Sequence, residues 1–111
     1  EEAGNGHGGL WISMPGDLRS VGYIQDLESQ AAAALDLLVH AAAGYVSGSI
    51  DEVSVECLDE LYETNVRAPY ALTRALLPAL RRRNGQVVFV NSSAVTSPNA
   101  GRRAAYTATK A

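Results

Sequence analysis

Short apolar runs alternate along this chain with longer segments whose apolar residues recur at helical spacing. Three runs bounded by glycine, proline or polar residues predict strands, at residues 10–14, 37–40 and 86–90. Between them, residues 20–35 and 54–83 carry leucine and other apolar residues three or four positions apart, which predicts helices. Alternation of this kind predicts an α/β fold with a parallel sheet and right-handed connections.

The second predicted helix has recognisable ends and two interruptions. Ser54 is a plausible N-cap, and the pair at residues 84–85, Asn-Gly, is typical of a helix end. Pro69 and Pro78 each remove a backbone donor, so we expect a kink near residues 65–69 and irregular geometry near Pro78. A further short helix is expected from Ala104 onward.

Small or polar residues follow each predicted strand. They are Asp17-Leu18, the stretch His40-Ala41-Ala42-Ala43, and Asn91-Ser92-Ser93. In open parallel sheets, ligands bind beyond the carboxyl ends of the strands. One crevice at that edge could therefore collect all three stretches.

Bulk properties restrict the class of function. The chain has 111 residues, the length of one small domain, and a formal charge of −3, which argues against nucleic acid as a partner. No apolar run is long enough to span a bilayer, and the N-terminal residues do not resemble a secretory signal. Cys57 is the only cysteine, so we expect a reducing compartment and a cytoplasmic protein.

Lys110 is the only lysine, and it stands four residues after Tyr106. Residues four apart share one face of a helix, so the two side chains can meet. A neighbouring ammonium favours the phenolate and lowers the pKa of a phenol from its ordinary value of about 10. The pair is therefore a candidate for general acid–base catalysis, although Tyr106 alone could equally be a packing aromatic.

Taken together, these residues resemble the classical short-chain dehydrogenase/reductase family. Tyr106 and Lys110 match its Tyr-x-x-x-Lys pair, and Ser93 stands thirteen residues before the tyrosine, as the family serine does. Asn65 resembles the asparagine midway along the family's long helix, and Asp17-Leu18 the pair that borders the adenine. The resemblance implies a partial Rossmann-like, doubly wound parallel sheet that contains the family's third to fifth strands.

The sequence departs from the family pattern in two places. Residues 40–43 read His-Ala-Ala-Ala where the family usually has Asn-Asn-Ala-Gly. His40 could be a satisfied histidine at a strand end or a polar contact near the cofactor ribose. The family's glycine-rich turn is not found, and the chain stops one residue after Lys110. We therefore expect residues 1–111 to be an internal fragment of a single NAD(P)-binding domain, inactive when isolated.

The resemblance implies hydride transfer between NAD or NADP and a small-molecule carbonyl or alcohol. Tyr106 would transfer the proton, Lys110 would lower its pKa, Ser93 would hold the substrate oxygen, and Asn65 would position a relay water. The implied cofactor-binding residues are Asp17, Leu18, His40, Ala41, Ala42, Ala43, Tyr106 and Lys110. No metal is implied, and the parent enzyme is expected to be a homodimer or homotetramer.

Two alternatives remain at this level. A relative that senses dinucleotides could keep the fold without turnover, although it would not need a proton donor. A sugar-nucleotide epimerase or dehydratase of the family's extended branch also uses the Tyr-x-x-x-Lys pair. The short spacing and Asn65 favour the classical branch over the extended one.

Overall fold

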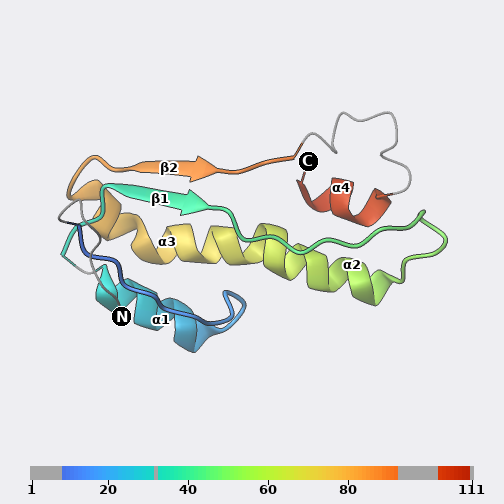
Figure 1. The fold of residues 1–111 in the computed structure, drawn as a ribbon, viewed down its shortest axis with the longest axis horizontal. Helices are drawn as coiled ribbons and strands as arrows, with labels where there is room; N and C mark the ends of the chain where they lie inside the picture. Colours follow the sequence, from blue (N-terminus) through green and yellow to red (C-terminus); the bar gives the residue numbers. More distant parts are fainter. Residues whose placement is uncertain (1–8, 32, 93–102, 111) are drawn as a thin grey trace.

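The computed structural model describes residues 9–31, 33–92 and 103–110 (Figure 1). The elements in chain order are α1 (Val21–Gln30), β1 (Leu37–His40), α2 (Val55–Tyr62), the π-helix η1 (Glu63–Arg67), α3 (Ala68–Arg81), β2 (Gln86–Phe89) and α4 (Ala104–Lys110). Helices and strands thus alternate, which confirms the predicted α/β class.

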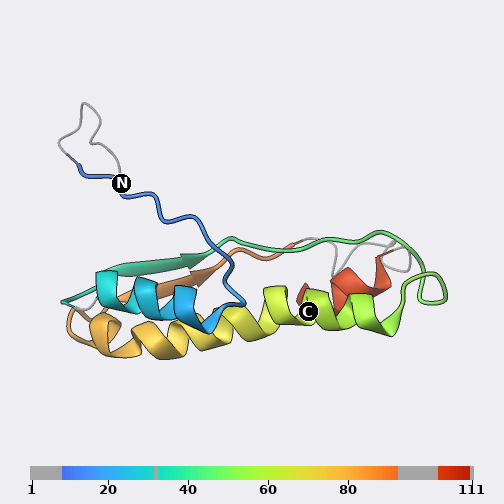
Figure 2. The same cartoon turned by 90° about the horizontal axis from the view of Figure 1, so that it is seen from below.

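Strands β1 and β2 are neighbours in a parallel two-stranded sheet. Leu37 pairs with Gln86 and His40 with Phe89, so the carboxyl ends of both strands lie at the same edge. Helices α1 and α3 form a second layer on one face of the sheet (Figures 1 and 2). The rod made by α2, η1 and α3 extends past the carboxyl edge, where α4 packs against α2 and η1.

The hydrophobic core lies between α3 and the sheet. Leu72, Leu76 and Leu80 are buried and follow one face of α3 at intervals of four residues. They pack against half-buried residues from the neighbouring elements, namely Leu18, Ile24, Leu27, Ala31, Leu35, Leu38 and Val87. On the opposite face of the sheet, Val39 and Val88 are 49% and 41% exposed, so among the described residues only one face is covered.

The strand predicted at residues 10–14 is not formed, and that prediction is wrong. A strand is held by hydrogen bonds to a neighbouring strand, and none lies beside this segment in the described part of the chain. Trp11 is 64% exposed. The segment is anchored at its end, where the Tyr23 hydroxyl of α1 donates a hydrogen bond to the Met14 carbonyl.

Helix α1 begins as predicted and ends earlier. The Ser20 hydroxyl caps it by accepting a hydrogen bond from the Tyr23 amide at 3.2 Å. The prediction extended the helix to residue 35, whereas it ends at Gln30. The Leu35 amide instead donates to the Ala79 carbonyl at 3.1 Å, which attaches the chain to the end of α3 just before β1 begins.

The long helix changes geometry in its middle. Pro69 has no amide hydrogen to complete the α-helical bond to the Asn65 carbonyl, and the helix widens into the π turn of Glu63–Arg67. The irregularity predicted at residues 65–69 is therefore confirmed, and such turns are frequent at functional sites. The irregular geometry expected near Pro78 is not found, because α3 runs through this exposed proline to Arg81.

Both predicted ends of the long helix are confirmed. The Ser54 hydroxyl accepts a hydrogen bond from the Cys57 amide at 3.1 Å. At the other end, Asn84 adopts a φ of 49°, and the Gly85 amide donates to the Leu80 carbonyl at 2.8 Å. This left-handed residue turns the chain sharply into β2.

Candidate functional site

Asn65 joins the π turn to the loop that follows β1. Its side-chain oxygen accepts a hydrogen bond from the Gly44 amide at 2.8 Å, and its nitrogen donates to the Gly44 carbonyl at 3.1 Å. The same nitrogen donates to the Thr109 hydroxyl at 2.9 Å. Both N–H groups of Asn65 are therefore used, as a half-buried asparagine on an apolar stripe requires.

Helix α4 lies against the loops that leave the two strands. The Lys110 ammonium donates a hydrogen bond to the Val90 carbonyl, just beyond β2, at 3.1 Å. The Tyr106 ring meets the Tyr45 ring edge-on, with centroids 4.8 Å apart and an interplanar angle of 70°. The Thr109 hydroxyl, one turn after Tyr106, donates to the Tyr106 carbonyl at 2.9 Å.

Three of the four predicted catalytic residues are thus brought to one region. Asn65 bonds to Thr109 on α4, the helix that also carries Tyr106 and Lys110. Tyr106 and Lys110 are both half-buried. Ser93 lies outside the described residues, so its role stays a prediction.

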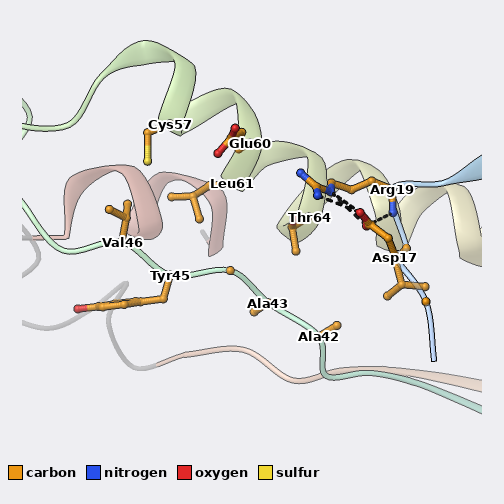
Figure 3. A pocket seen from close by; sticks show the side chains of 13 residues that line it. Asp17, Arg19, Ala42, Ala43, Tyr45, Val46, Cys57, Glu60, Leu61 and Thr64 are labelled. Atoms are coloured by element: carbon orange, nitrogen blue, oxygen red, sulfur yellow. Dashed lines mark hydrogen bonds and ion pairs between the residues drawn. The ribbon is translucent and has the colours of Figure 1, made fainter. Parts of the chain in front are cut away.

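A cavity of about 540 Å³ opens between the loop after β1, the start of the long helix and residues 16–19 (Figure 3). Four predicted cofactor-binding residues line it, namely Asp17, Leu18, Ala42 and Ala43. Ala42 and Ala43 are small and exposed, so a ligand could reach the backbone there. The cavity is completed by Tyr45 on one side and by Leu61 and Thr64 on the other.

Asp17 is engaged by a neighbour on its own loop. The Arg19 guanidinium forms an ion pair with the Asp17 carboxylate at 2.9 Å and bonds to both of its oxygens (Figure 3). The hydrogen bonds from Arg19 lower the pKa of Asp17 below its ordinary value. A ligand at this end of the cavity would therefore meet the ionised Asp17 carboxylate paired with the Arg19 guanidinium.

A second cavity, of about 450 Å³, lies between β2, α3 and the end of α4. His40, Ala42, Asn65 and Lys110 line it. The predicted cofactor residues are thus divided between two cavities, and Ala42 lines both. Two of the predicted cofactor residues, the exposed Ala41 and the half-buried Tyr106, line neither cavity.

His40 has the surroundings of a satisfied histidine at a strand end. It is 8% exposed, and its Nε2 lies 2.7 Å from the Thr73 hydroxyl of α3. Its ring stacks on Phe89, the residue opposite it in the sheet, at a centroid distance of 4.8 Å. Burial lowers the pKa of His40, which keeps the ring neutral at physiological pH. A contact of His40 with the cofactor stays a prediction.

The structure adds Thr109 and the loop pair Gly44 and Tyr45 to the residues that the sequence singled out. All three contact Asn65 or Tyr106. The sequence held one signal for Thr109, because a threonine in a helix can bond to a carbonyl one turn back. Its second bond, to Asn65, joins residues 44 positions apart and could not be seen in a local pattern.

Neither a membrane span nor a metal cluster is found in the described ranges. No helix there is long and apolar enough to cross a membrane. No group of three or more histidine, cysteine or acidic side chains in those ranges is placed to hold a metal ion.

Known protein families and curated proteins include relatives of this chain. A family model described as short chain dehydrogenase matches residues 2–111. Dehydrogenase/reductase SDR family member 4 of Homo sapiens is 37% identical over 101 residues, which cover 84% of this chain and 36% of the relative. The chain spans about a third of the length of such curated relatives.

Solved structures give the same assignment. The KRED1-Pglu enzyme matches with a TM-score of 0.81 and 30% identity, over 87% of this chain and 42% of the other. A short-chain dehydrogenase from Streptomyces avermitilis matches with a TM-score of 0.74 and 35% identity, over 85% and 36% respectively. The partial Rossmann-like fold that the sequence suggested is confirmed by these matches. Because the family model covers nearly the whole sequence, the chain belongs to the short-chain dehydrogenase family.

Proposed function

We propose that the protein containing this chain transfers hydride between NAD or NADP and the carbonyl or alcohol carbon of a small molecule. The observation that supports this most strongly is the attachment of α4 to the site. Its Lys110 bonds to the carbonyl after β2, and its Thr109 bonds to Asn65, which holds the loop after β1. The phenol of Tyr106 would then lie near the edge of the sheet where ligands bind in this class of fold.

The residues present are compatible with a dinucleotide. The small side chains of Ala42 and Ala43 leave the backbone beside the larger cavity accessible, and Asp17 with Leu18 closes its far end. These residues, with His40 and Ala41 alongside, would hold the cofactor in the proposal, and Lys110 would bond its ribose. The nicotinamide ring supplies or accepts the hydride.

The chain's own residues would handle the proton. Tyr106 would donate a proton to the carbonyl oxygen during reduction and accept one during oxidation, while Ser93 held that oxygen by a hydrogen bond. Asn65 would position a water that links Lys110 to solvent. Both N–H groups of Asn65 already donate to protein atoms, and its Oδ1 accepts from the Gly44 amide, so the second lone pair of Oδ1 would accept a bond from that water.

Residues 1–111 would form part of a single NAD(P)-binding domain in a cytoplasmic homodimer or homotetramer. Cys57 as the only cysteine supports a reducing compartment. The uncovered sheet face at Val39 and Val88 supports the presence of further structure over it.

We further propose that the 111 residues alone bind no dinucleotide. Their surface area of 7508 Å² exceeds the roughly 5,900 Å² expected of a compact monomer of this mass. The radius of gyration is 16.5 Å, against about 13 Å for a compact domain of this length. A calorimetric titration that gave micromolar NADPH binding to residues 1–111 would refute this part of the proposal.

The reaction class is tested on the complete product of the gene that encodes these residues. NADH and NADPH deuterated at the transferring position are supplied with benzaldehyde, cyclohexanone or ethyl acetoacetate, and the alcohols are analysed by mass spectrometry. Deuterium on the former carbonyl carbon is the expected result. Binding of a reduced nucleotide without transfer to any probe would favour the sensing alternative, and failure to bind either nucleotide would contradict the proposal.

A further inference from the structure

Thr109 has the most buried side chain described in α4. It is 8% exposed, and its hydroxyl is paired twice. The hydroxyl donates to the Tyr106 carbonyl at 2.9 Å and accepts from the Asn65 amide at 2.9 Å. One polar atom thus ties the turn that carries Tyr106 to the π turn of the long helix.

The contacts around Thr109 form a closed circuit. Asn65 continues from Thr109 to both backbone groups of Gly44, at 2.8 and 3.1 Å. The next residue, Tyr45, returns to α4 through its ring contact with Tyr106. The Tyr106 ring and backbone are therefore both held to the loop after β1, one by Tyr45 and the other through Thr109 and Asn65.

Thr107 provides an internal comparison on the same helix. Its hydroxyl is buried and has no hydrogen-bond partner in the described structure. Both threonines of α4 have a buried hydroxyl, but the hydroxyl of Thr109 connects two elements and that of Thr107 connects none. Replacing each threonine by valine therefore separates the effect of the bonded hydroxyl from the effect of removing any threonine hydroxyl in α4.

We infer that Thr109 is a positioning residue, whose hydroxyl fixes Asn65 and the loop after β1 relative to Tyr106 and Lys110. This inference rests on the proposed function for its catalytic consequence. Without the hydroxyl, one N–H of the Asn65 amide loses its acceptor, and the amide is held only by its two hydrogen bonds to Gly44. Loss of one such hydrogen bond at a reacting site corresponds to a fall of about tenfold in rate.

The coupling is tested first without any substrate. Amide hydrogen exchange of Gly44 is measured by NMR in the complete gene product labelled at glycine. We expect Gly44 to exchange about tenfold faster in Thr109→Val, and at the parent rate in Thr109→Ser and Thr107→Val. If Thr109→Val does not fold, Thr109→Ala, which also lacks the hydroxyl and adds no bulk, takes its place. Unchanged exchange in the folded variant would overturn the coupling.

The catalytic consequence is tested with the same variants and the carbonyl probe that turns over fastest. We expect Thr109→Val to lower kcat about tenfold, to leave KM for the reduced nucleotide unchanged, and to move the pH profile of kcat. Thr109→Ser should restore all three. If Thr109→Val only reduced the amount of folded protein, kcat would fall by the same factor at every pH and the pH dependence would keep its shape. An unchanged shape of the pH profile would therefore overturn the positioning role. An equal effect in Thr107→Val would overturn it as well.

Failure of this inference can be told apart from failure of the proposed function. If Tyr106→Phe abolishes turnover while Thr109→Val leaves kcat and its pH profile at parent values, the proposed function stands and the role of Thr109 is refuted. If Tyr106→Phe retains normal turnover, the proposed function fails, and the exchange rate of Gly44 still decides whether Thr109 couples the two elements.

Discussion

Replacement of Asn65 by alanine removes three hydrogen bonds in one step. They run to the Gly44 amide, the Gly44 carbonyl and the Thr109 hydroxyl, at 2.8, 3.1 and 2.9 Å. Each is worth about 1 kcal/mol net, and the better helix propensity of alanine returns about 0.5 kcal/mol. The expected loss in the free energy of unfolding is therefore about 2 to 3 kcal/mol.

The assay is urea unfolding of the complete gene product, followed by circular dichroism. Arg67→Ala is the matched control, because Arg67 belongs to the same π turn and its side chain is exposed. Surface replacements of that kind usually change stability by less than about 0.5 kcal/mol. Asn65→Asp retains an acceptor for the Gly44 amide and loses both donors, so its expected loss is about 2 kcal/mol.

One result would refute the reasoning. If Asn65→Ala cost no more than Arg67→Ala, the three hydrogen bonds would not hold the loop after β1 to the π turn. The positions that the structure gives Gly44 and Thr109 relative to the long helix would then have no energetic basis.

Two further predictions concern glycine and histidine positions. Gly85→Ala should cost about 1 to 3 kcal/mol in urea unfolding, because the new Cβ would lie 2.6 Å from the Leu35 carbonyl oxygen. Gly22 lies in α1, and apart from its neighbours and its own helical backbone no atom would lie nearer than 3.8 Å to a Cβ there. Gly22→Ala should therefore stabilise by about 0.5 to 1 kcal/mol, and equal effects of the two replacements would contradict the packing at Gly85. Burial lowers the pKa of His40, so protonation favours the unfolded state: the His40 contribution is complete above about pH 6.5 and is lost as the pH falls below it. His40→Asn should flatten the fall in urea midpoint between about pH 7.5 and 5, and an unchanged slope would exclude His40 as its source.

Local signals in the sequence were sufficient where the hydrogen bonds that define an element join residues close together in the sequence. Ser54 caps its helix through the amide of Cys57, three residues away, and Asn84 with Gly85 ends the helix by a turn of six residues. The strands predicted at 37–40 and 86–90 combine apolar character with a partner available in the chain, and they pair in register over 37–40 and 86–89. The segment at 10–14 has the same apolar character, but a strand also needs a neighbour, which no local pattern reports.

The helices show the same division. The missing amide of Pro69 is a local property, and it predicted an irregularity near residues 65–69 without indicating the π turn that forms there. Pro78 also lacks an amide, but it lies near the exposed end of α3 and the helix continues through it. Helix α1 stops at Gln30 although the alanines after it favour helix, since the Leu35 amide is bonded to Ala79 from α3. Tertiary contacts of this kind override local propensity.

For the site, residue spacing along the chain indicated Tyr106 and Lys110, and the family resemblance indicated Asn65. Neither indicated that Asn65 would reach α4 through Thr109, because that bond depends on how the π turn and α4 pack. The roles of these residues and of Ser93 in proton transfer remain predictions.

The most direct test replaces Tyr106 by phenylalanine in the complete gene product, with Tyr62→Phe as the control at an exposed tyrosine of α2. Hydride transfer to the carbonyl probe is followed by the absorbance of the reduced nicotinamide, and nucleotide binding by fluorescence. We predict that Tyr106→Phe binds the nucleotide as the parent does and turns over about a hundredfold to ten-thousandfold more slowly, as expected for a lost general acid, while Tyr62→Phe is unchanged. Turnover within tenfold of the parent in Tyr106→Phe would contradict the account.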